Sequence, residues 1–369
     1  MKYYELLSNE MKATLQKAGF TSPTPIQEKT LELILNGWDI MGIAQTGTGK
    51  TAAFAVPIIE KTFTNNSKTQ TLVLCPTREL ALQITEVFRK LSAHRKLRII
   101  SVYGGQSVSV QIKAIRAGAQ IVVGTPGRVK DLINRNVLKL KNVRTVVLDE
   151  ADEMLDFGFL PDIKTILANV TGQHQTLLFA ATMNKAVSGV VKQFLSDAVR
   201  IEIGHCNEPT QTVKQSYMTA DERTKSSAVQ NLLKQQSPRL TLVFCNTRRR
   251  VKTLQKQLFS QGLSVSCLHG DMSQHQRDTI MDTFRKGKTS VLVATDVAAR
   301  GLDVKDVDLV INYDIPDKME YYVHRIGRTG RAGHTGRACT LVSPHDQAKI
   351  IDLERKFRIK LAEETAVSC

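Results

Sequence analysis

The stretch "WDIMGIAQTGTGKT", residues 38–51, decides the fold class of the chain. It begins with a short apolar run, which is typical of a buried strand. A turn follows with Gly47 and Gly49, and glycine is the residue that suits tight turns and close approach of the backbone to a ligand. Residues 44–51 match the phosphate-loop pattern G-x-x-x-x-G-K-[ST], except that Ala44 replaces the first glycine. The stretch therefore predicts a strand, a phosphate-binding loop and the start of a helix.

The chemistry of this loop survives the change at Ala44. Backbone N–H groups turn towards a phosphate, and the following helix offers its positive end. Lys50 is placed to reach the β and γ phosphates, and Thr51 to ligate magnesium. The predicted ATP-binding loop comprises Ala44, Gln45, Thr46, Gly47, Thr48, Gly49, Lys50 and Thr51.

Similar apolar runs recur along the whole chain and alternate with stretches of helical spacing. In the first half they lie at 38–44, 71–75, 98–103, 120–125, 144–149 and 176–182, and in the second at 213–218, 240–245, 263–270, 290–296 and 307–314. Continuous apolar strands between helices predict mainly parallel sheets with helices on both faces, and functional residues just past the strand ends. The polar stretch 205–212 predicts a linker between an N-terminal domain, 1–204, and a C-terminal domain, 213–369. The two halves share this rhythm without an obvious sequence repeat.

Composition limits the class of protein and its partners. The net charge is +16, and it divides evenly: residues 1–204 hold 25 basic and 17 acidic side chains, and the remainder 26 and 18. An excess spread over both halves favours a polyanion that touches both, such as nucleic acid, over a membrane-binding helix or a basic tail. The six cysteines show no Cys-x-x-Cys pair or zinc-site spacing, and neither a signal peptide nor a membrane span is visible. We therefore expect a soluble cytoplasmic protein with no membrane partner.

A second motif, "VVLDEADEMLD" at 146–156, supplies the acid that a phosphate loop requires. Asp149 ends an aliphatic strand and is predicted to hold Mg²⁺ together with Thr51, partly through water. Glu150 follows and is predicted to polarise the water that attacks the γ-phosphate. Glu153 and Asp156 are interpreted as a solvated helix face.

With these residues the chain resembles the DEAD-box family of ATP-dependent RNA helicases. Beside "AQTGTGKT" and "DEAD" (149–152), further elements match in order: "GFTSPTPIQ" (19–27), "PTREL" (76–80), "GG" (104–105), "TPGR" (125–128), "HGDMSQHQR" (269–277), "ATDVAARGLD" (294–303) and "HRIGRTGR" (324–331). The resemblance covers nearly the whole chain. It implies two tandem RecA-like domains, the cofactors ATP and Mg²⁺, and RNA bound across both domains.

The resemblance also assigns residues to ATP. It implies that Gln27 reads the adenine edge, which fits a side chain with one donor group and one acceptor. Phe20 would pack near the base and Asp303 would contact the ribose. The alternatives are a polar residue at a helix start for Gln27 and ordinary core packing for Phe20.

The "HRIGRTGR" motif places Arg325, Arg328 and Arg331 at three-residue intervals. Three guanidinium groups so close repel one another unless an anion lies among them. Because the second half has no phosphate loop, Arg328 and Arg331 are predicted to act as arginine fingers on the γ-phosphate. By resemblance, His324 joins the same network.

The remaining elements are basic, small and turn-forming, as expected of groups that bind phosphates and sugars. The predicted RNA-binding residues are Thr77, Arg78, Gly104, Gly105, Thr125, Arg128, Gly270, Arg277, Thr295 and Arg300. None of these elements carries an aromatic platform for base stacking, so we expect recognition of the backbone with little sequence preference. The resemblance implies that the helix after Arg128 bends one strand, and that ATP and RNA together drive domain closure and local unwinding.

One position departs from the family. Where the family usually reads Ser-Ala-Thr, this chain reads Ala180, Ala181 and Thr182. The family uses this stretch to couple the acid motif to the second domain, and we expect Asp152 to contact Thr182 and to connect with His324. The hydroxyl missing at Ala180 predicts that ATP hydrolysis persists while its coupling to strand separation is weaker.

Two rival functions stay open from the sequence. One is an ATP-gated RNA clamp or scaffold with little unwinding activity, and the other is a DNA-directed motor. The chain stops soon after the expected end of the second domain with no visible RNA-binding tail, and we expect it to act as a monomer.

Overall fold

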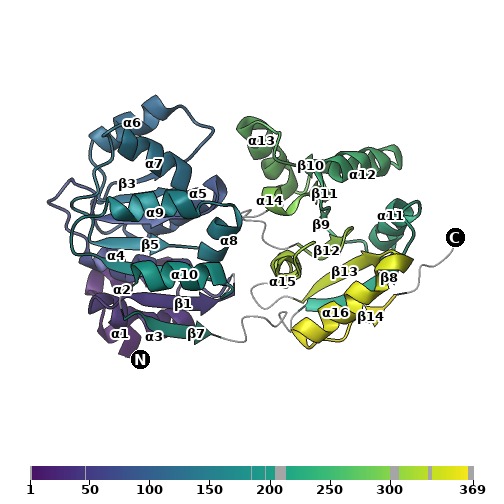
Figure 1. The fold of residues 1–369 in the computed structure, drawn as a ribbon, viewed down its shortest axis with the longest axis horizontal. Coiled ribbons are helices and arrows are strands. Elements are labelled where there is room, and N and C mark those ends of the chain that lie inside the picture. The colour runs from purple at the N-terminus through teal and green to yellow at the C-terminus, as the bar shows by residue number, and fades with distance from the viewer. Residues whose placement is uncertain are drawn as a thin grey trace. The chain divides into compact units, whose positions relative to one another are not determined.

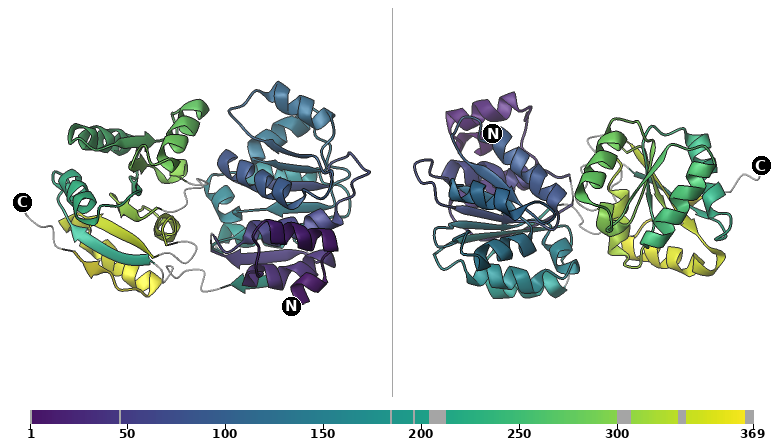
Figure 2. Two further views of the ribbon diagram at one scale, coloured as in Figure 1. Left: turned by 180° about the vertical axis from the view of Figure 1, so that it is seen from behind. Right: turned by 90° about the horizontal axis from the view of Figure 1, so that it is seen from above.

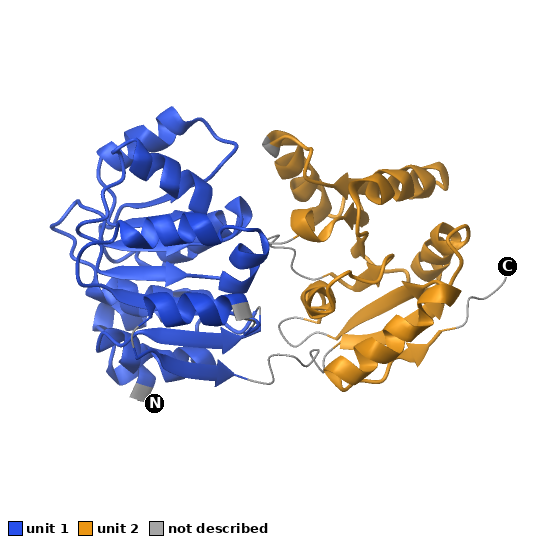
Figure 3. Ribbon diagram, viewed as in Figure 1, with its two compact units in different colours: residues 1–206 blue, residues 207–369 orange. Residues whose placement is uncertain are grey.

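The chain folds into two compact units, residues 1–206 and 207–369 (Figure 3). The structure is a computed structural model, and it describes residues 2–45, 47–183, 185–195, 197–203, 213–299, 307–330 and 335–364. The predicted linker, 205–212, lies outside these residues. No helix within the described ranges is long and apolar enough to cross a membrane.

The first unit is built on a seven-stranded sheet in which every recorded pairing is parallel. Its strands are β1 (Ile40–Ala44), β2 (Thr71–Leu74), β3 (Ile99–Val102), β4 (Ile121–Gly124), β5 (Thr145–Leu148), β6 (Gln175–Ala180) and β7 (Val199–Ile203). Their order across the sheet is β3-β4-β2-β5-β6-β1-β7. Strands β1, β2, β4, β5 and β6 are buried along their whole length, as helices on both faces require.

Two helical layers cover this sheet (Figures 1 and 2). One layer holds α1 (Lys2–Glu5), α2 (Asn9–Lys17), α3 (Pro25–Leu35), α4 (Lys50–Lys61) and α5 (Arg78–Leu91). The other holds α6 (Val108–Arg116), α7 (Pro126–Asn134), α8 (Ala151–Asp156), α9 (Leu160–Ala168) and α10 (Lys185–Phe194). Adjacent strand residues belong to opposite cores: Val147 packs with the first layer, and Val146 and Leu148 with the second. This alternation explains why the strands read as uninterrupted apolar runs.

The second unit repeats the arrangement. Its strands are β8 (Val213–Thr219), β9 (Thr241–Phe244), β10 (Val265–Leu268), β11 (Val291–Ala294), β12 (Leu309–Asn312), β13 (Gly336–Val342) and β14 (Ala362–Glu363). Helices α11 (Lys225–Gln236) and α12 (Arg248–Ser260) cover one face. The other face packs against α13 (Gln274–Arg285), α14 (Asp296–Ala299), α15 (Glu320–Ile326) and α16 (Gln347–Phe357), which the short helix η1 (Pro344–Asp346) precedes.

The strand order of this sheet is β10-β11-β9-β12-β13-β8-β14, and all its recorded pairings are parallel. Numbered from the first strand of each unit, both sheets therefore have the order 3-4-2-5-6-1-7. The predicted fold class, with parallel sheets in two α/β domains, is confirmed. Each of the eleven apolar runs named from the sequence overlaps one strand.

Three strands were missed because their sequences lack a continuous apolar run. Strand β7 reads "VRIEI" and alternates apolar with charged residues, as suits the edge of a sheet. Strand β13 starts with Gly336 and Arg337, and β14 has only two residues.

Contrary to the prediction from the sequence, the two halves share a short sequence repeat. "TLVLCPTR" at 71–78 and "TLVFCNTR" at 241–248 are identical at six of eight positions. Both segments form the second strand of a unit and the turn into the following helix.

Candidate active site and nucleic-acid interface

The phosphate loop joins β1 to α4. Gly47 and Gly49 have φ of 85° and 89°, which L side chains rarely adopt, so both glycines are required by the turn. Lys50 is the first residue of α4 and is only 7% exposed; its Nζ donates to the carbonyl of Ala44 at 2.8 Å. The Lys50 side chain thus folds back over the loop. Binding of a phosphate would require it to leave the Ala44 carbonyl. Thr48 Oγ1 donates to the carbonyl of Gln45 at 2.8 Å, and Thr46 lies outside the described residues.

Asp149 and Glu150 follow directly on β5. Asp149 is 2% exposed, and burial raises the pKa of its carboxyl to about 7, although the nearby Lys50 ammonium opposes the rise. Its Oδ1 accepts from the backbone N–H of Glu150 at 3.0 Å. Glu150 has a φ of 49°, in the left-handed region, and precedes α8. A strained backbone at this position is a mark of functional sites.

Gln27 connects the phosphate loop to α3, the helix that precedes β1. This residue of α3 is 3% exposed; its Oε1 accepts from the N–H of Thr24 at 3.0 Å, and its Nε2 donates to the carbonyl of Gly49 at 3.2 Å. A Cβ at Gly49 would lie 2.5 Å from Gln27 Nε2, so the two segments are in close contact. The side chain performs the helix-start role while lying beside the phosphate loop. Phe20 is half-buried and packs against the core of the unit.

The acid motif is tied to the end of β6. Asp152 Oδ2 accepts hydrogen bonds from Ala181 N at 3.1 Å, Thr182 N at 2.8 Å and Thr182 Oγ1 at 2.9 Å. The structure thus brings Asp152 and Thr182 together. Ala180, the last residue of β6, is 1% exposed and carries no hydroxyl beside this network.

Of the two acids interpreted as a solvated face, only Asp156 is exposed. Glu153 is 4% exposed, so its interpretation as a solvated residue was wrong. The helix is short and its first residues pack on the sheet, because Ala151 and Met154 belong to the core. Helical spacing alone does not reveal which face of a six-residue helix is covered.

The predicted RNA-binding residues of the first unit follow β2, β3 and β4, which are neighbours in the sheet. Thr77 caps α5 through a hydrogen bond from Leu80 N to its Oγ1 at 3.2 Å. The Arg78 guanidinium lies 4.6 Å from the centre of the Tyr103 ring. Arg128, in α7, donates to the carbonyl of Gln106 at 3.2 Å and to Gln111 Oε1 at 3.1 Å.

Gln111 links these segments, and the sequence interpretation missed it. It is 3% exposed, and its carboxamide binds both the N–H and the carbonyl of Tyr103, at 3.3 and 3.1 Å. Arg78, Tyr103, Gln111 and Arg128 are therefore connected side by side. Gly104 and Gly105 are exposed beside them, Gly105 with a φ of 79°, and Thr125 is half-buried at the start of α7.

In the second unit the corresponding residues follow β10 and β11. Gly270 is exposed, Thr295 is 7% exposed, and Arg277 Nη2 donates to the carbonyl of Ala298 at 3.3 Å. These positions gather at the end of the sheet equivalent to that used in the first unit. The predicted residues Arg300, Asp303 and Arg331 lie outside the described residues.

The expectation that Arg325, Arg328 and Arg331 surround one anion was wrong for Arg325. Its side chain is 1% exposed, and it donates from Nε and Nη2 to the two carboxylate oxygens of Asp296 at 2.6 and 2.7 Å. The counter-charge for Arg325 is thus inside the protein. Arg328 is 7% exposed, and His324 is half-buried in the last turn of α15.

The sequence repeat identifies two further candidates. Thr247 caps α12 by accepting from Arg250 N at 3.2 Å, as Thr77 caps α5. Arg248 follows, in the place of Arg78, and pairs with Asp271. Aligning the two halves would have revealed both residues.

Comparisons with known proteins agree with this geometry. The family description "DEAD/DEAH box helicase" matches residues 24–190, and "Helicase conserved C-terminal domain" matches residues 224–333. The DEAD-box ATP-dependent RNA helicase CshA of Geobacillus kaustophilus is 45% identical over 355 residues, which cover 96% of this chain and 76% of the relative. The chain belongs to the DEAD-box ATP-dependent RNA helicases.

Other members of the family extend the likeness. The ATP-dependent RNA helicase CshA of Limosilactobacillus reuteri is 45% identical and covers 98% of this chain, 73% of its own length. Saccharomyces cerevisiae Dbp5 bound to RNA and ADP BeF3 has a TM-score of 0.88 at 32% identity, covering 98% of this chain and 94% of that one. Mss116p bound to ssRNA and AMP-PNP also has a TM-score of 0.88, at 28% identity, and covers 99% and 78% of the two chains.

The residues around the phosphate loop fit a magnesium ion. The donors that the first unit offers are hard oxygens, the Asp149 carboxylate and the Thr51 hydroxyl, which suit Mg²⁺. Among the described residues no group of three or more His, Cys, Asp or Glu side chains could hold a metal. An ion at Asp149 would therefore take its remaining ligands from water and phosphate, as Mg²⁺ commonly does.

Proposed function

We propose that this DEAD-box helicase couples RNA-stimulated ATP hydrolysis to domain closure and to local, sequence-nonspecific unwinding of short RNA duplexes or remodelling of ribonucleoproteins. The observation that carries the proposal is the connection, within one unit, between the phosphate loop, the acid motif and the end of β6. Lys50 and Asp149 are close enough for the ammonium to oppose the rise in the carboxyl pKa, and Asp152 binds Thr182. A change in the contacts of the γ-phosphate could thus be transmitted through the acid motif to Thr182 at the end of β6.

In the proposed reaction Lys50 releases the Ala44 carbonyl and binds the β and γ phosphates. Mg²⁺, held by Asp149, Thr51 and water, would neutralise phosphate charge. Glu150 accepts a proton from the attacking water, and Arg328 and Arg331 stabilise charge on the γ-phosphate. Gln27 exchanges its contact with Gly49 for the adenine edge, with Phe20 near the base and Asp303 at the ribose.

RNA is proposed to bind along the strand ends of both units through its backbone. Hydroxyl groups, glycine amides and guanidinium groups are the ligands for phosphate and sugar. Two relatives of known structure are bound to RNA, one of them to ssRNA, and this supports single-stranded RNA as the bound form. The +16 net charge adds long-range attraction that weakens with salt. We further propose that the protein works as a monomer in the cytoplasm.

The experiment that tests the proposal measures ATP hydrolysis without nucleic acid, with single-stranded RNA, with duplex RNA and with DNA. RNA should stimulate hydrolysis strongly and DNA weakly. Glu150→Gln should lower the stimulated rate about 10³-fold, as expected for loss of a general base. Asp156→Asn makes the same chemical change at an exposed position of the adjacent helix, and it should retain the full rate.

Three outcomes would contradict the proposal. Undiminished hydrolysis by Glu150→Gln removes the assigned base. Equal stimulation by DNA points to a DNA-directed motor. A stable RNA complex under a non-hydrolysable ATP analogue, without strand separation under ATP, favours the RNA clamp.

A further inference from the structure

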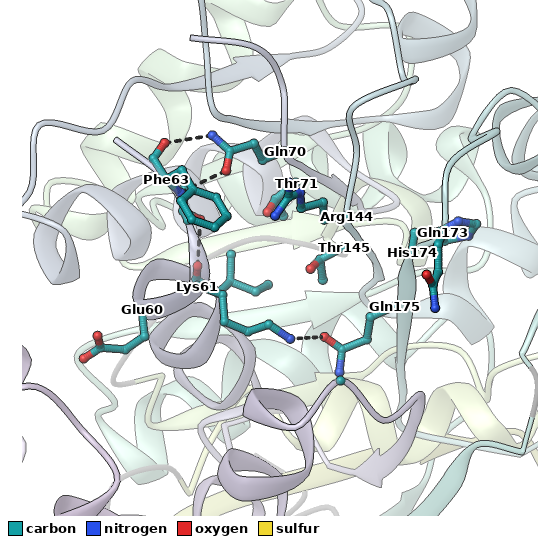
Figure 4. Close-up of a pocket in the computed structure, with 13 residues that line it drawn as sticks. Glu60, Lys61, Phe63, Gln70, Thr71, Arg144, Thr145, Gln173, His174 and Gln175 are labelled. Carbon is teal, nitrogen blue, oxygen red and sulfur yellow. Dashed lines mark hydrogen bonds between the residues drawn. The ribbon is translucent and has the colours of Figure 1, made fainter. Parts of the chain in front are cut away.

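A cleft of about 740 Å³ lies in the first unit among residues that the proposed reaction does not use (Figure 4). Thr71, Thr145 and Gln175 line it, and they are the first residues of β2, β5 and β6. In the same unit, the candidate residues Arg78, Glu150 and Thr182 follow the other ends of these three parallel strands. The cleft therefore lies at the N-terminal ends of the strands, and the candidate active site lies at their C-terminal ends.

The cleft has a buried polar floor and an exposed rim. Thr71, Thr145 and Gln175 are at most 5% exposed, whereas Phe63 is 50% exposed and Arg144 and Gln173 are also exposed. A small-molecule site normally encloses most of its ligand. An open rim around a polar floor suits a segment of a protein chain better.

Two cations face the cleft without an acidic partner. Lys61 Nζ donates to the Ile34 carbonyl at 2.9 Å and to Gln175 Oε1 at 3.2 Å, and burial lowers the pKa of the ammonium. The Arg144 guanidinium lies 4.8 Å from the centre of the Phe63 ring. No carboxylate of the described residues forms an ion pair with Lys61 or Arg144.

Glu60 is the only acidic side chain among the lining residues, all of which are described, and it is directed elsewhere. Its Oε1 accepts from the N–H and the hydroxyl of Ser8 at 3.1 and 2.7 Å. In Figure 4 its carboxylate points away from the other labelled side chains. The cleft thus combines two unneutralised cations with one exposed aromatic ring. Aromatic residues and arginine are enriched where proteins meet.

We propose that this cleft is a docking site for an acidic segment of a partner protein. Carboxylates of the segment pair with Arg144 and Lys61, and one apolar side chain packs on Phe63. Charge complementarity of this kind sets the partner and the association rate. Because the cleft is at the opposite end of the strands from the ATP and RNA candidates of the first unit, a docked partner would leave those residues open.

The chain provides its own reporter for the test. Trp38 is the single tryptophan, is 52% exposed, follows the cleft residue Gly37, and accepts a hydrogen bond from Gln175 Nε2 at its carbonyl, at 2.6 Å. The probe is a capped peptide in which aspartate and leucine alternate. Its control has asparagine in place of aspartate. Titration of the full chain, followed by tryptophan fluorescence and by calorimetry, should show binding of the acidic probe that weakens as salt is added.

Substitutions locate the site. Arg144→Glu and Phe63→Ala should each weaken binding of the probe, the charge reversal by about tenfold, which corresponds to about 1.4 kcal/mol. Arg355→Glu is the matched control, because it reverses a charge at a 79% exposed side chain of the second unit and should bind the probe normally. Both cleft variants should keep RNA-stimulated ATP hydrolysis within about twofold of the wild type, since rim charges have little effect at a distance.

Several results would overturn the proposal. Equal affinity of Arg144→Glu and Arg355→Glu would place the peptide elsewhere, as would displacement of the probe by RNA. Equal binding of the asparagine probe would remove the role of charge. Competition by inorganic phosphate that is lost in Arg144→Glu would instead mark a small-anion site.

Discussion

The two units share a strand order and differ in what lies at equivalent positions. In each unit the first helix after the first strand begins with a lysine six residues beyond that strand: Lys50 after β1 and Lys225 after β8. Lys50 rests on a backbone carbonyl, a contact that a phosphate can replace. Lys225 Nζ instead binds Glu222 Oε1 at 2.8 Å.

The fifth strands show the same contrast. In register, Asp149 and Glu150 correspond to Tyr313 and Asp314, because Asp149 N and Tyr313 N both donate to the carbonyl that ends the second strand of their sheet, at 2.9 Å. Asp314 Oδ1 accepts from Arg250 at 2.7 Å and lies 4.0 Å from Lys225.

Arg250 completes the cluster by binding Glu222 at 2.7 Å. The second unit therefore pairs the lysine that corresponds to Lys50 with carboxylates of its own. The same strand order thus holds a lysine on a backbone carbonyl in the first unit and a lysine paired with carboxylates in the second.

The strongest test of this difference between the units makes the same substitution at both lysines. Lys50→Met should lower RNA-stimulated ATP hydrolysis about 10³-fold, as loss of a preorganised charge at a transferring phosphoryl group does. Lys225→Met should leave the rate per folded molecule within about twofold, because Lys225 binds a carboxylate of its own unit. ATP hydrolysis and circular dichroism measure the two effects. Comparable loss of activity in the two variants would show that the second lysine also serves the nucleotide.

The second unit contains a buried ion pair between Arg325 and Asp296. The Arg325 guanidinium is 1% exposed and binds both carboxylate oxygens of Asp296. Asp296→Asn should leave one of these two acceptor oxygens and remove the negative charge that Arg325 pairs with. Breaking a buried pair in this way costs about 3 kcal/mol. Urea unfolding should show this loss in the transition of the second unit. The exposed pair of Lys286 and Asp282 provides the control, since Asp282→Asn should change stability by less than about 0.5 kcal/mol.

The two units should also respond differently to pH. Burial raises the pKa of Asp149 to about 7, whereas its counterpart Tyr313 has a pKa raised to about 12. Between the ordinary pKa of an aspartate, 3.8, and about 7, the folded protein holds the Asp149 proton and the unfolded chain does not. The stability from this group therefore falls as pH rises through that window, by at most about 1.4 kcal/mol per pH unit.

Asp149→Asn should remove this contribution, and it is measured by urea unfolding at several pH values without nucleotide. An unchanged pH slope in the variant would contradict the assigned pKa. Tyr313→Phe should leave the slope unaltered, because the tyrosine does not titrate in the window.

The smallest expected effect concerns coupling rather than chemistry. Ala180→Ser places a hydroxyl next to the contact between Asp152 and Thr182. One further hydrogen bond of about 1 kcal/mol should raise the ratio of unwinding to ATP hydrolysis about fivefold, with hydrolysis itself little changed. Duplex separation and ATP hydrolysis measured on the same samples give the ratio. An unchanged ratio would contradict the hypothesis that Ala180 weakens coupling.

The sequence by itself determined the fold class, the phosphate-loop motif and the acid motif. Strand periodicity is a local property, and the glycine loop, Lys50, Asp149 and Glu150 are recognisable because their chemistry depends on short spacing and on strand ends. The repeat at residues 71–78 and 241–248 is likewise visible in the sequence alone.

Only the tertiary structure decided which charges are used inside the protein. Arg325 finds Asp296 and Asn246, which lie 29 and 79 positions away in the chain, and so does not join an external anion. Glu153 is covered by packing, and Gln111 joins Tyr103 to Arg128. The basic cleft is assembled from the beginnings of strands that are distant in sequence. Burial and pairing depend on such long-range contacts, which no local pattern encodes.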